Sequence, residues 1–251
     1  MSAPHARAAA KGRRSGGLAI LYEDRELLAI DKPAGLLTMA TDKERERTAY
    51  WLATDYVRRG FAGSRHRVFI VHRLDRDTSG VLVFAKTPAA KNALQDHWDE
   101  VEKTYVAVAH GLFAEPEGTI SSYLAENRAQ VVYSTTDPAL GKLSHTAYRV
   151  VREINGLSLL EIRLLTGRKN QIRVHLADRG HPVLGDGKYG RPDDGCKRLA
   201  LHARRLTLKH PSTGQRLTFE APVPPHFPGW SVSSAAQPPA RGGHRATPSA
   251  S

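Results

Sequence analysis

The residues best suited to chemistry lie at positions 71–80, which read Val-His-Arg-Leu-Asp-Arg-Asp-Thr-Ser-Gly. The second half of this stretch has the composition of a turn. Apolar runs at 68–71 and 81–84 flank it and are predicted to be short buried strands. The turn would hold the carboxylate of Asp75 at the rim of a sheet, between two arginines that keep it ionised. The alternative is an acidic turn residue that only accepts hydrogen bonds from its own backbone.

A second charged segment, 166–175, reads Thr-Gly-Arg-Lys-Asn-Gln-Ile-Arg-Val-His. From Arg168 it predicts a helix that runs to about Leu176, with Gly180 beyond its end. Three basic residues in the first six positions would then lie at a helix N-terminus, which favours anions. The alternative is a basic surface helix.

Two further residues are candidates for the same site. Tyr105 lies in the alternating run 103–108, a predicted strand, where its hydroxyl could shuttle a proton. The alternative is a core aromatic residue with a satisfied hydroxyl. Lys32 opens the Lys-Pro-Ala-Gly break after a predicted strand at 27–30, and would either face the site or cover the surface.

The net charge of +12 points to a polyanionic partner, most often nucleic acid. The terminal segments supply six of these charges, and the remaining core has 31 basic against 25 acidic residues. A basic stretch follows a helix predicted at 48–60, where it would hold phosphates or form a solvated face; it contains Arg58, Arg59, Arg65 and Arg67. The alternative reading of the net charge is solubility.

Composition predicts one folded domain at 18–230 between disordered tails at 1–17 and 231–251. The single cysteine, Cys196, excludes an internal disulfide and fits a reducing compartment, so we expect a cytoplasmic protein. The sequence has no apolar run long enough for a membrane span and no secretory signal. Metal-ligand spacing and phosphate-binding loops are also absent from it.

Other segments predict the framework. Thr87-Pro88 is expected to start a helix that runs past Val101, and Asn155-Gly156 to turn a hairpin of 146–153 and 157–165. A last hairpin pairs 199–209 with 216–220. In that hairpin the leucines are expected in the core and the charged residues outside it, including His202, Arg204, Arg205 and Lys209.

Seven blocks together resemble the RluA-type pseudouridine synthases, which isomerise uridine to pseudouridine in structural RNA. They follow the family's order over roughly residues 20–225 and occupy positions 32–35, 72–80, 103–107, 166–175, 181–190, 199–203 and 210–214. Two departures are visible. Lys169-Asn170 stands where the family usually has Thr-His or Ser-His, and the N-terminal segment is too short for the S4 domain of many relatives.

The resemblance implies an α+β fold with a mixed, largely antiparallel bent β-sheet, flanking helices and a central RNA-binding cleft. It implies that Asp75 is the essential carboxylate, which acts at C1′ of the target uridine as the glycosidic bond breaks. It also implies that Tyr105 stacks near the base and takes the C5 proton, and that Arg173 pairs with Asp75. Arg168 is the second candidate for that pairing. Arg73 would fill the space left by the flipped uridine, and the remaining substrate contacts would come from His72 and Lys32.

The resemblance further implies a monomer that acts on rRNA or tRNA, with no cofactor, metal or membrane. Two other functions stay open at this point. One is a non-catalytic RNA-binding or ribosome-assembly protein that uses the same basic cleft. The other is a hydrolase that uses Asp75 and nearby histidines, although the scattered histidines do not have metal-ligand spacing.

Overall fold

The structure is a computed structural model that describes residues 13–15, 17–41, 47–59, 61, 63–191 and 195–230. Most of the two predicted tails lies outside these ranges. Residues 13–15, which the sequence placed in the N-terminal tail, instead form a short strand that pairs with residues 18–20. The ordered framework therefore begins before position 18.

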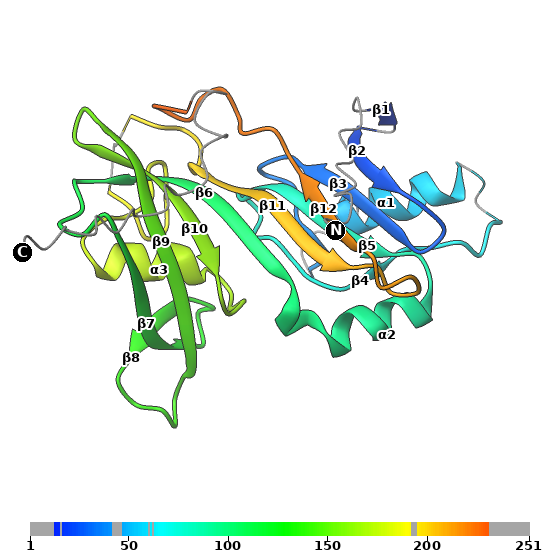
Figure 1. Cartoon of the computed structure of the whole chain (residues 1–251), viewed down its shortest axis with the longest axis horizontal. Coiled ribbons are helices and arrows are strands. Elements are labelled where there is room, and N and C mark those ends of the chain that lie inside the picture. The colour runs from blue at the N-terminus through cyan, green and yellow to red at the C-terminus, as the bar shows by residue number, and fades with distance from the viewer. Residues whose placement is uncertain are drawn as a thin grey trace, which may run out of the picture.

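A single bent sheet organises the described residues, and all of its strand pairs except one are antiparallel (Figure 1). Its order is β1-β2-β3-β5-β11-β6-β10-β9-β7-β8, with β12 paired to β11 and β4 paired to β5. This confirms the predicted mixed, largely antiparallel sheet. The strands are β1 (Arg13–Ser15), β2 (Leu18–Glu23), β3 (Leu27–Lys32), β4 (Phe69–Ile70), β5 (Ser79–Ala85), β6 (Glu102–His110), β7 (Glu117–Glu126), β8 (Val132–Thr135), β9 (Lys142–Ile154), β10 (Leu157–Leu164), β11 (Leu201–Lys209) and β12 (Arg216–Glu220).

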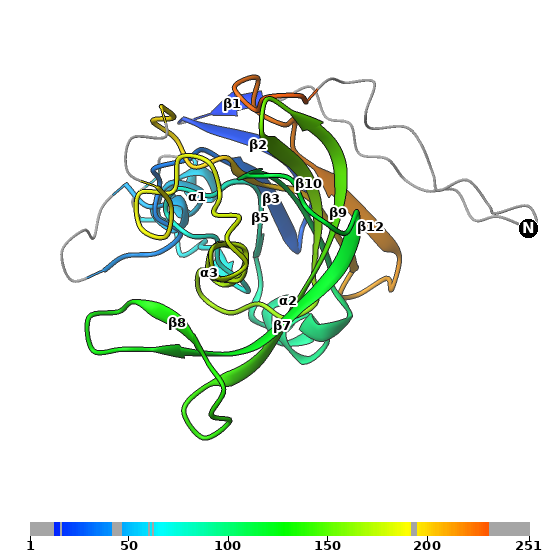
Figure 2. The same ribbon diagram turned by 90° about the vertical axis from the view of Figure 1, so that its left-hand side faces the viewer.

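Helices cover both faces of the sheet. On one face α1 (Ala49–Arg58) and α3 (Gln171–Asp178) share the larger apolar cluster with β3, β5, β6 and β10. On the other face α2 (Pro88–Asp96) packs in a second cluster with β5, β11 and β12. Figure 2 shows the sheet curving around α3. The curved face therefore carries both α1 and α3.

The exceptional strand pair, β5 with β11, joins the two halves of the sheet. It is parallel and short, with Ser79 opposite His202 and Gly80 opposite Ala203. Gly80 has φ +111, and a Cβ there would lie 2.2 Å from the carbonyl oxygen of Ala203. A residue with a side chain at position 80 would therefore separate the halves of the sheet.

Most predicted elements are present, and the differences have local causes. The helix after Thr87 ends at Asp96 and is followed by a single 3-10 turn, Trp98–Glu100, so it does not reach Val101. Helix α3 starts at Gln171 because Asn170 adopts a left-handed conformation, φ 53, that ordinary helical residues do not take. The predicted helical start at Arg168 was therefore wrong.

The last hairpin also corrects a prediction, since His202 and Arg204 are buried. His202 is fully enclosed, with Nδ1 2.8 Å from the hydroxyl of Ser79. The guanidinium of Arg204 lies 4.9 Å from the centre of the Trp230 ring. Strand β11 is central, with neighbours on both edges, so alternate residues on both of its faces are enclosed.

Candidate active site

A cavity of about 270 Å³ opens on the α3 face of the sheet. Its walls come from three distant parts of the chain, namely the turn before β5, the start of β6 and the segment that leads into α3. The lining residues are Val71, His72, Arg73, Leu74, Asp75, Thr78, Trp98, Lys103, Tyr105, Leu164, Gly167, Arg168, Lys169, Asn170, Gln171, Ile172, Arg173 and Leu201. The two segments singled out by the sequence therefore face each other across one cavity.

Lys32 supports the turn that carries Asp75 through hydrogen bonds to backbone carbonyl groups. Its side chain is completely buried, and Nζ donates hydrogen bonds to the carbonyl oxygens of Pro33, Leu36 and Arg76 at 2.8–2.9 Å. Burial lowers the pKa of Lys32 to about 8. Neither sequence-based alternative was right, because this lysine neither lines the cavity nor covers the surface. The structure gives it a supporting role for the turn.

A second support comes from the segment that leads into α1. The hydroxyl of Thr38 donates to the carbonyl of Leu74 at 2.7 Å and accepts from its N–H at 3.1 Å. The N–H groups of Ala49 and Tyr50 donate to the carbonyls of Leu37 and Thr38. The N-terminus of α1 is thus connected to the turn before Asp75 through residues 37 and 38.

His72 is held as a neutral ring at the edge of the cavity. The backbone N–H of Val83 donates to Nε2 at 2.9 Å, and the ring stacks on Trp98 with centroids 4.8 Å apart. Burial, reinforced by the charge of Lys103, lowers the pKa of His72 to about 3. His72 therefore lines the cavity and holds the turn in register with β5.

Arg173 is the central cation of the opposite wall. Nε and Nη2 donate to the two carboxylate oxygens of Asp186 at 2.7 and 2.6 Å, whereas Nη1 lies 4.0 Å from Oδ2 of Asp75. The predicted approach of Arg173 to Asp75 is present, but Asp186 is the closer partner. Asp186 is buried and also accepts from the N–H groups of Lys188 and Tyr189.

Asn170 connects both walls. Its backbone N–H reaches the carboxylate of Asp75, its Oδ1 accepts from Arg173 at 3.2 Å, and its Nδ2 donates to the hydroxyl of Tyr189 at 3.1 Å. The Tyr189 ring lies 5.2 Å from the guanidinium of Arg173. The departure from the family at Lys169-Asn170 therefore affects the positioning of the two charged groups.

Two of the three basic residues at the predicted anion site form ion pairs with acidic residues of this chain. Lys169 binds Glu126 on β7, Arg173 binds Asp186, and only Arg168 of the three basic residues is exposed. Of the predicted anion site at the start of α3, Arg168 is thus the cation that no acidic partner covers in the described part of the chain. The two exposed cations at the cavity are Arg73 and Arg168, one from each wall.

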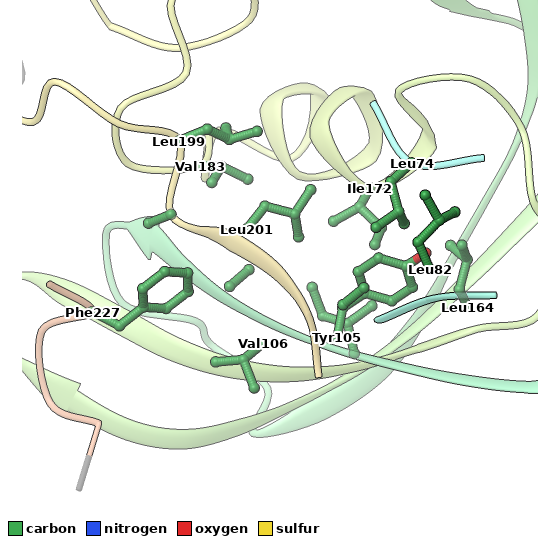
Figure 3. Packing of buried hydrophobic residues seen from close by; sticks show 14 of the residues in the cluster. Leu74, Leu82, Tyr105, Val106, Leu164, Ile172, Val183, Leu199, Leu201 and Phe227 are labelled. Carbon is green, nitrogen blue, oxygen red and sulfur yellow. The ribbon is translucent and has the colours of Figure 1, made fainter. Parts of the chain in front are cut away.

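Asp75 and Tyr105 meet inside the cavity. Burial raises the pKa of Asp75, while Arg173, Arg73, the Asn170 N–H and Lys32 act in the opposite direction. Burial and the charge of Asp75 raise the pKa of Tyr105, so its hydroxyl stays protonated. Figure 3 shows the Tyr105 ring beside Leu74, Leu164 and Ile172. The site thus pairs a carboxylate with a neutral phenol in an apolar setting.

The sequence missed Asp186 and Trp98. Asp186 lies in a glycine-punctuated loop with no periodicity, although Gly185 before it signals close packing, since a Cβ there would lie 2.0 Å from the carbonyl of Arg198. Trp98 was expected within a helix. Within the described ranges no cluster of three or more histidines, cysteines or acidic residues could hold a metal ion, and no described helix is long and apolar enough to cross a membrane.

Comparison with known proteins places this chain in a family. Residues 26–178 match the family model of RNA pseudouridylate synthases. The chain is 35% identical over 211 residues to the dual-specificity RNA pseudouridine synthase RluA of Yersinia pestis, covering 80% of this chain and 97% of that protein. It is 38% identical over 223 residues to the ribosomal large subunit pseudouridine synthase D of Nitrosomonas europaea, covering 82% and 62%.

The fold agrees with that assignment. The solved structure of human RNA pseudouridylate synthase domain containing 4 superimposes with a TM-score of 0.69 at 23% identity, covering 83% of this chain and 89% of that one. The chain belongs to the RNA pseudouridylate synthase family. It is an RNA pseudouridine synthase, an enzyme that isomerises uridine to pseudouridine within RNA.

Proposed function

We propose that Asp75 is the essential carboxylate of this isomerisation, and that residues 18–230 form the catalytic domain. The observation that carries the proposal is the position of Asp75, the only carboxylate among the described residues that line the cavity, facing Arg173 and Tyr105. The raised pKa means that the surroundings do not fully compensate the carboxylate charge. Such a carboxylate is a better nucleophile than one stabilised by close ion pairs.

The reaction exchanges one bond to the ribose for another. Asp75 acts at C1′ as the bond between C1′ and N1 of uracil breaks, and the freed base turns so that C5 faces C1′. A bond then forms between C5 and C1′, C5 loses its proton and N1 gains one. Atoms and electrons balance without an oxidant, a reductant or water, so the reaction needs no cofactor or metal.

Tyr105 is proposed to move the C5 proton. Because the phenol is protonated, it accepts this proton only as it passes its own proton on. The ring also forms an apolar floor on which the free uracil can turn. Both roles follow from its position on β6 beneath the Asp75 turn.

The substrate is proposed to be a flipped uridine of rRNA or tRNA, bound by a monomeric enzyme in the cytoplasm. Arg73 and Arg168, the exposed cations on either wall, are placed to bind phosphates, and Arg73 to fill the gap left by the flipped base. His72 offers a ring edge to the base. The names of the relatives, a dual-specificity RNA enzyme and a large-subunit ribosomal enzyme, support structural RNA as the target class.

Release of tritium from RNA labelled at uridine C5 tests the proposal. Unmodified tRNA and rRNA transcripts are incubated separately with the wild-type protein and with Asp75→Asn. We expect release from one transcript and none with the variant, at nearly unchanged RNA affinity. Turnover by Asp75→Asn would remove the assignment. Tight binding without release by the wild-type protein would favour a non-catalytic RNA-binding role.

The same assay separates the role of Tyr105. Tyr105→Phe keeps the ring and removes the hydroxyl, so RNA binding is expected to stay intact. Tritium release should fall by roughly 10²–10⁴, the usual contribution of a positioned proton-transfer group. A wild-type rate in Tyr105→Phe would leave Tyr105 with a packing role only.

A further inference from the structure

A basic surface lies outside the catalytic cavity, at the C-terminal end of α1. Arg59, Arg65 and Arg67 are exposed there, and none of the three forms a salt bridge with a carboxylate in the described part of the chain. A hollow of about 1020 Å³ opens between this helix end, the turn that joins β2 to β3 and the residues that follow β5. Its one acidic lining residue, Glu23, is already bound at 2.8 Å by Lys86.

This basic surface is on the same face of the sheet as the cavity. Helix α1 packs in the apolar cluster that also holds α3, and its first turn is bonded to the segment at Thr38 that fixes Leu74. Ten helical residues span about 15 Å. The chain then returns from Arg67 through β4 to Arg73 within six residues, a span of at most about 20 Å. A strand of a few nucleotides could therefore reach from one place to the other.

The backbone conformation of Arg59 does not explain why an arginine is present at this position. Arg59 caps α1 in the left-handed region at φ 55, where glycine is the favoured residue. Its backbone N–H bonds to the carbonyls of Asp55 and Tyr56, and any residue could make those bonds. The guanidinium thus stands exposed at a position where a side chain disfavours the fold.

Two exposed aromatic residues belong to the same segment. Phe61, between Arg59 and Arg65 in the chain, is 69% exposed, and Trp51, in the first turn of α1 and about 12 Å along the helix from Arg59, is 45% exposed. Aromatic rings between cations suit nucleic acid, because bases stack on the rings while phosphates bind the cations. An acidic protein segment would use the charges but not the rings.

We propose that this α1 surface, formed by Trp51, Arg59, Phe61, Arg65 and Arg67, binds the same RNA a few nucleotides from the target uridine. The proposal rests on the proposed function, since it takes the cavity as the place of the flipped uridine. The interaction is with backbone and stacked bases, so it adds affinity without choosing the uridine. Saturating RNA should therefore hide its loss from the rate of chemistry.

Two double variants, each lacking two exposed arginines, test the proposal. Arg59→Gly with Arg67→Ala alters the α1 surface. Arg152→Ala with Arg163→Ala alters the β9–β10 hairpin at the opposite end of the molecule (Figure 1). Dissociation constants are measured with unmodified tRNA and rRNA transcripts over a range of salt concentrations, together with tritium release at saturating RNA.

The α1 variant is expected to bind roughly tenfold more weakly than the control variant, with an unchanged maximal rate of tritium release. The slope of log affinity against log salt should fall by about 0.7 for each phosphate that the variant no longer neutralises. The single change Arg59→Gly should leave the melting temperature equal or higher, which a structural role of this arginine would not allow.

Equal affinity and equal salt slope in the two double variants would overturn the proposal and leave the surface to another partner. The proposed function fails separately, when the wild-type protein releases no tritium. In that event weaker binding by the α1 variant would still support an RNA-binding role of this surface.

Discussion

The two walls of the cavity are held by different kinds of contact. On the Asp75 wall, the side chains of Lys32, Thr38 and His72 bind backbone atoms. On the α3 wall, side chains bind one another, with Arg173 on Asp186 at the centre. The first wall fixes the path of a turn, and the second fixes the position of a charge.

This difference determines what each wall contributes to the reaction. Under the proposed function, a turn fixed by its backbone presents Asp75 to C1′, and its raised pKa shows that its carboxylate is incompletely paired. A guanidinium that is already bound by Asp186 stands 4.0 Å from Asp75, where it orients the carboxylate without neutralising it closely. The position of Asp75 and the charge that faces it are therefore controlled by separate parts of the chain.

The largest expected effect comes from breaking the α3 wall with Asp186→Asn. The change leaves the buried guanidinium of Arg173 without its carboxylate, so the free energy of unfolding should fall by about 3–5 kcal/mol. Denaturant unfolding measures it. The control is Asp178→Asn, which changes an exposed aspartate on α3, the helix that carries Arg173. Its free energy of unfolding should fall by less than about 1 kcal/mol. A small loss for both variants would show that the pair with Asp186 is dispensable.

A smaller loss is expected on the Asp75 wall from Lys32→Met. Three carbonyl groups lose their donor, whereas the apolar stem is replaced by one of similar length, so unfolding should become easier by about 2–4 kcal/mol. The variant should also lower the rate of tritium release in the folded protein, because the turn at Arg76 is no longer held. Lys209→Met, where the side chain is 69% exposed, is the control for removing a lysine. Equal stability of the two variants would contradict the supporting role of Lys32.

The smallest expected effect is on pH dependence. The proposed mechanism uses the ionised form of Asp75, whose pKa is raised, so activity should fall on acidification with a midpoint above about 3.9, the ordinary value for aspartate. The folded protein binds this proton more tightly than the unfolded chain, so charge at position 75 disfavours folding at neutral pH. Asp75→Asn should therefore melt at an equal or higher temperature at pH 7. Asp77→Asn, an exposed neighbour, should leave the acid limb of the rate profile unchanged.

The sequence predicted the elements better than it predicted the contacts between them. Asp75, Tyr105 and Arg173 were identified from motifs, and the structure brings all three to one cavity. Lys32 was misassigned because the carbonyls that enclose it come from positions 33, 36 and 76, and their convergence is tertiary. Asp186 was missed because its pairing with Arg173 depends on how an irregular loop folds back on α3.

The start of α3 was misplaced for a related reason. Basic residues and helix propensity both favoured a start at Arg168, but the left-handed conformation of Asn170 turns its backbone N–H toward Asp75. That conformation depends on hydrogen bonds with Arg173 and Tyr189, which lie further along the chain. Local propensity does not include these bonds.

The short parallel seam between β5 and β11 also has a consequence for synthesis. Its two strands are separated by more than a hundred residues, at 79–85 and 201–209. During translation, β5 leaves the ribosome long before β11. Part of the edge of β5 therefore stays unpaired until β11 has also left the ribosome. Both walls of the cavity are translated before that point, but the two halves of the sheet that carry them are joined only afterwards. The catalytic cleft is therefore expected to be among the last features to assemble, so unfinished chains would be catalytically silent.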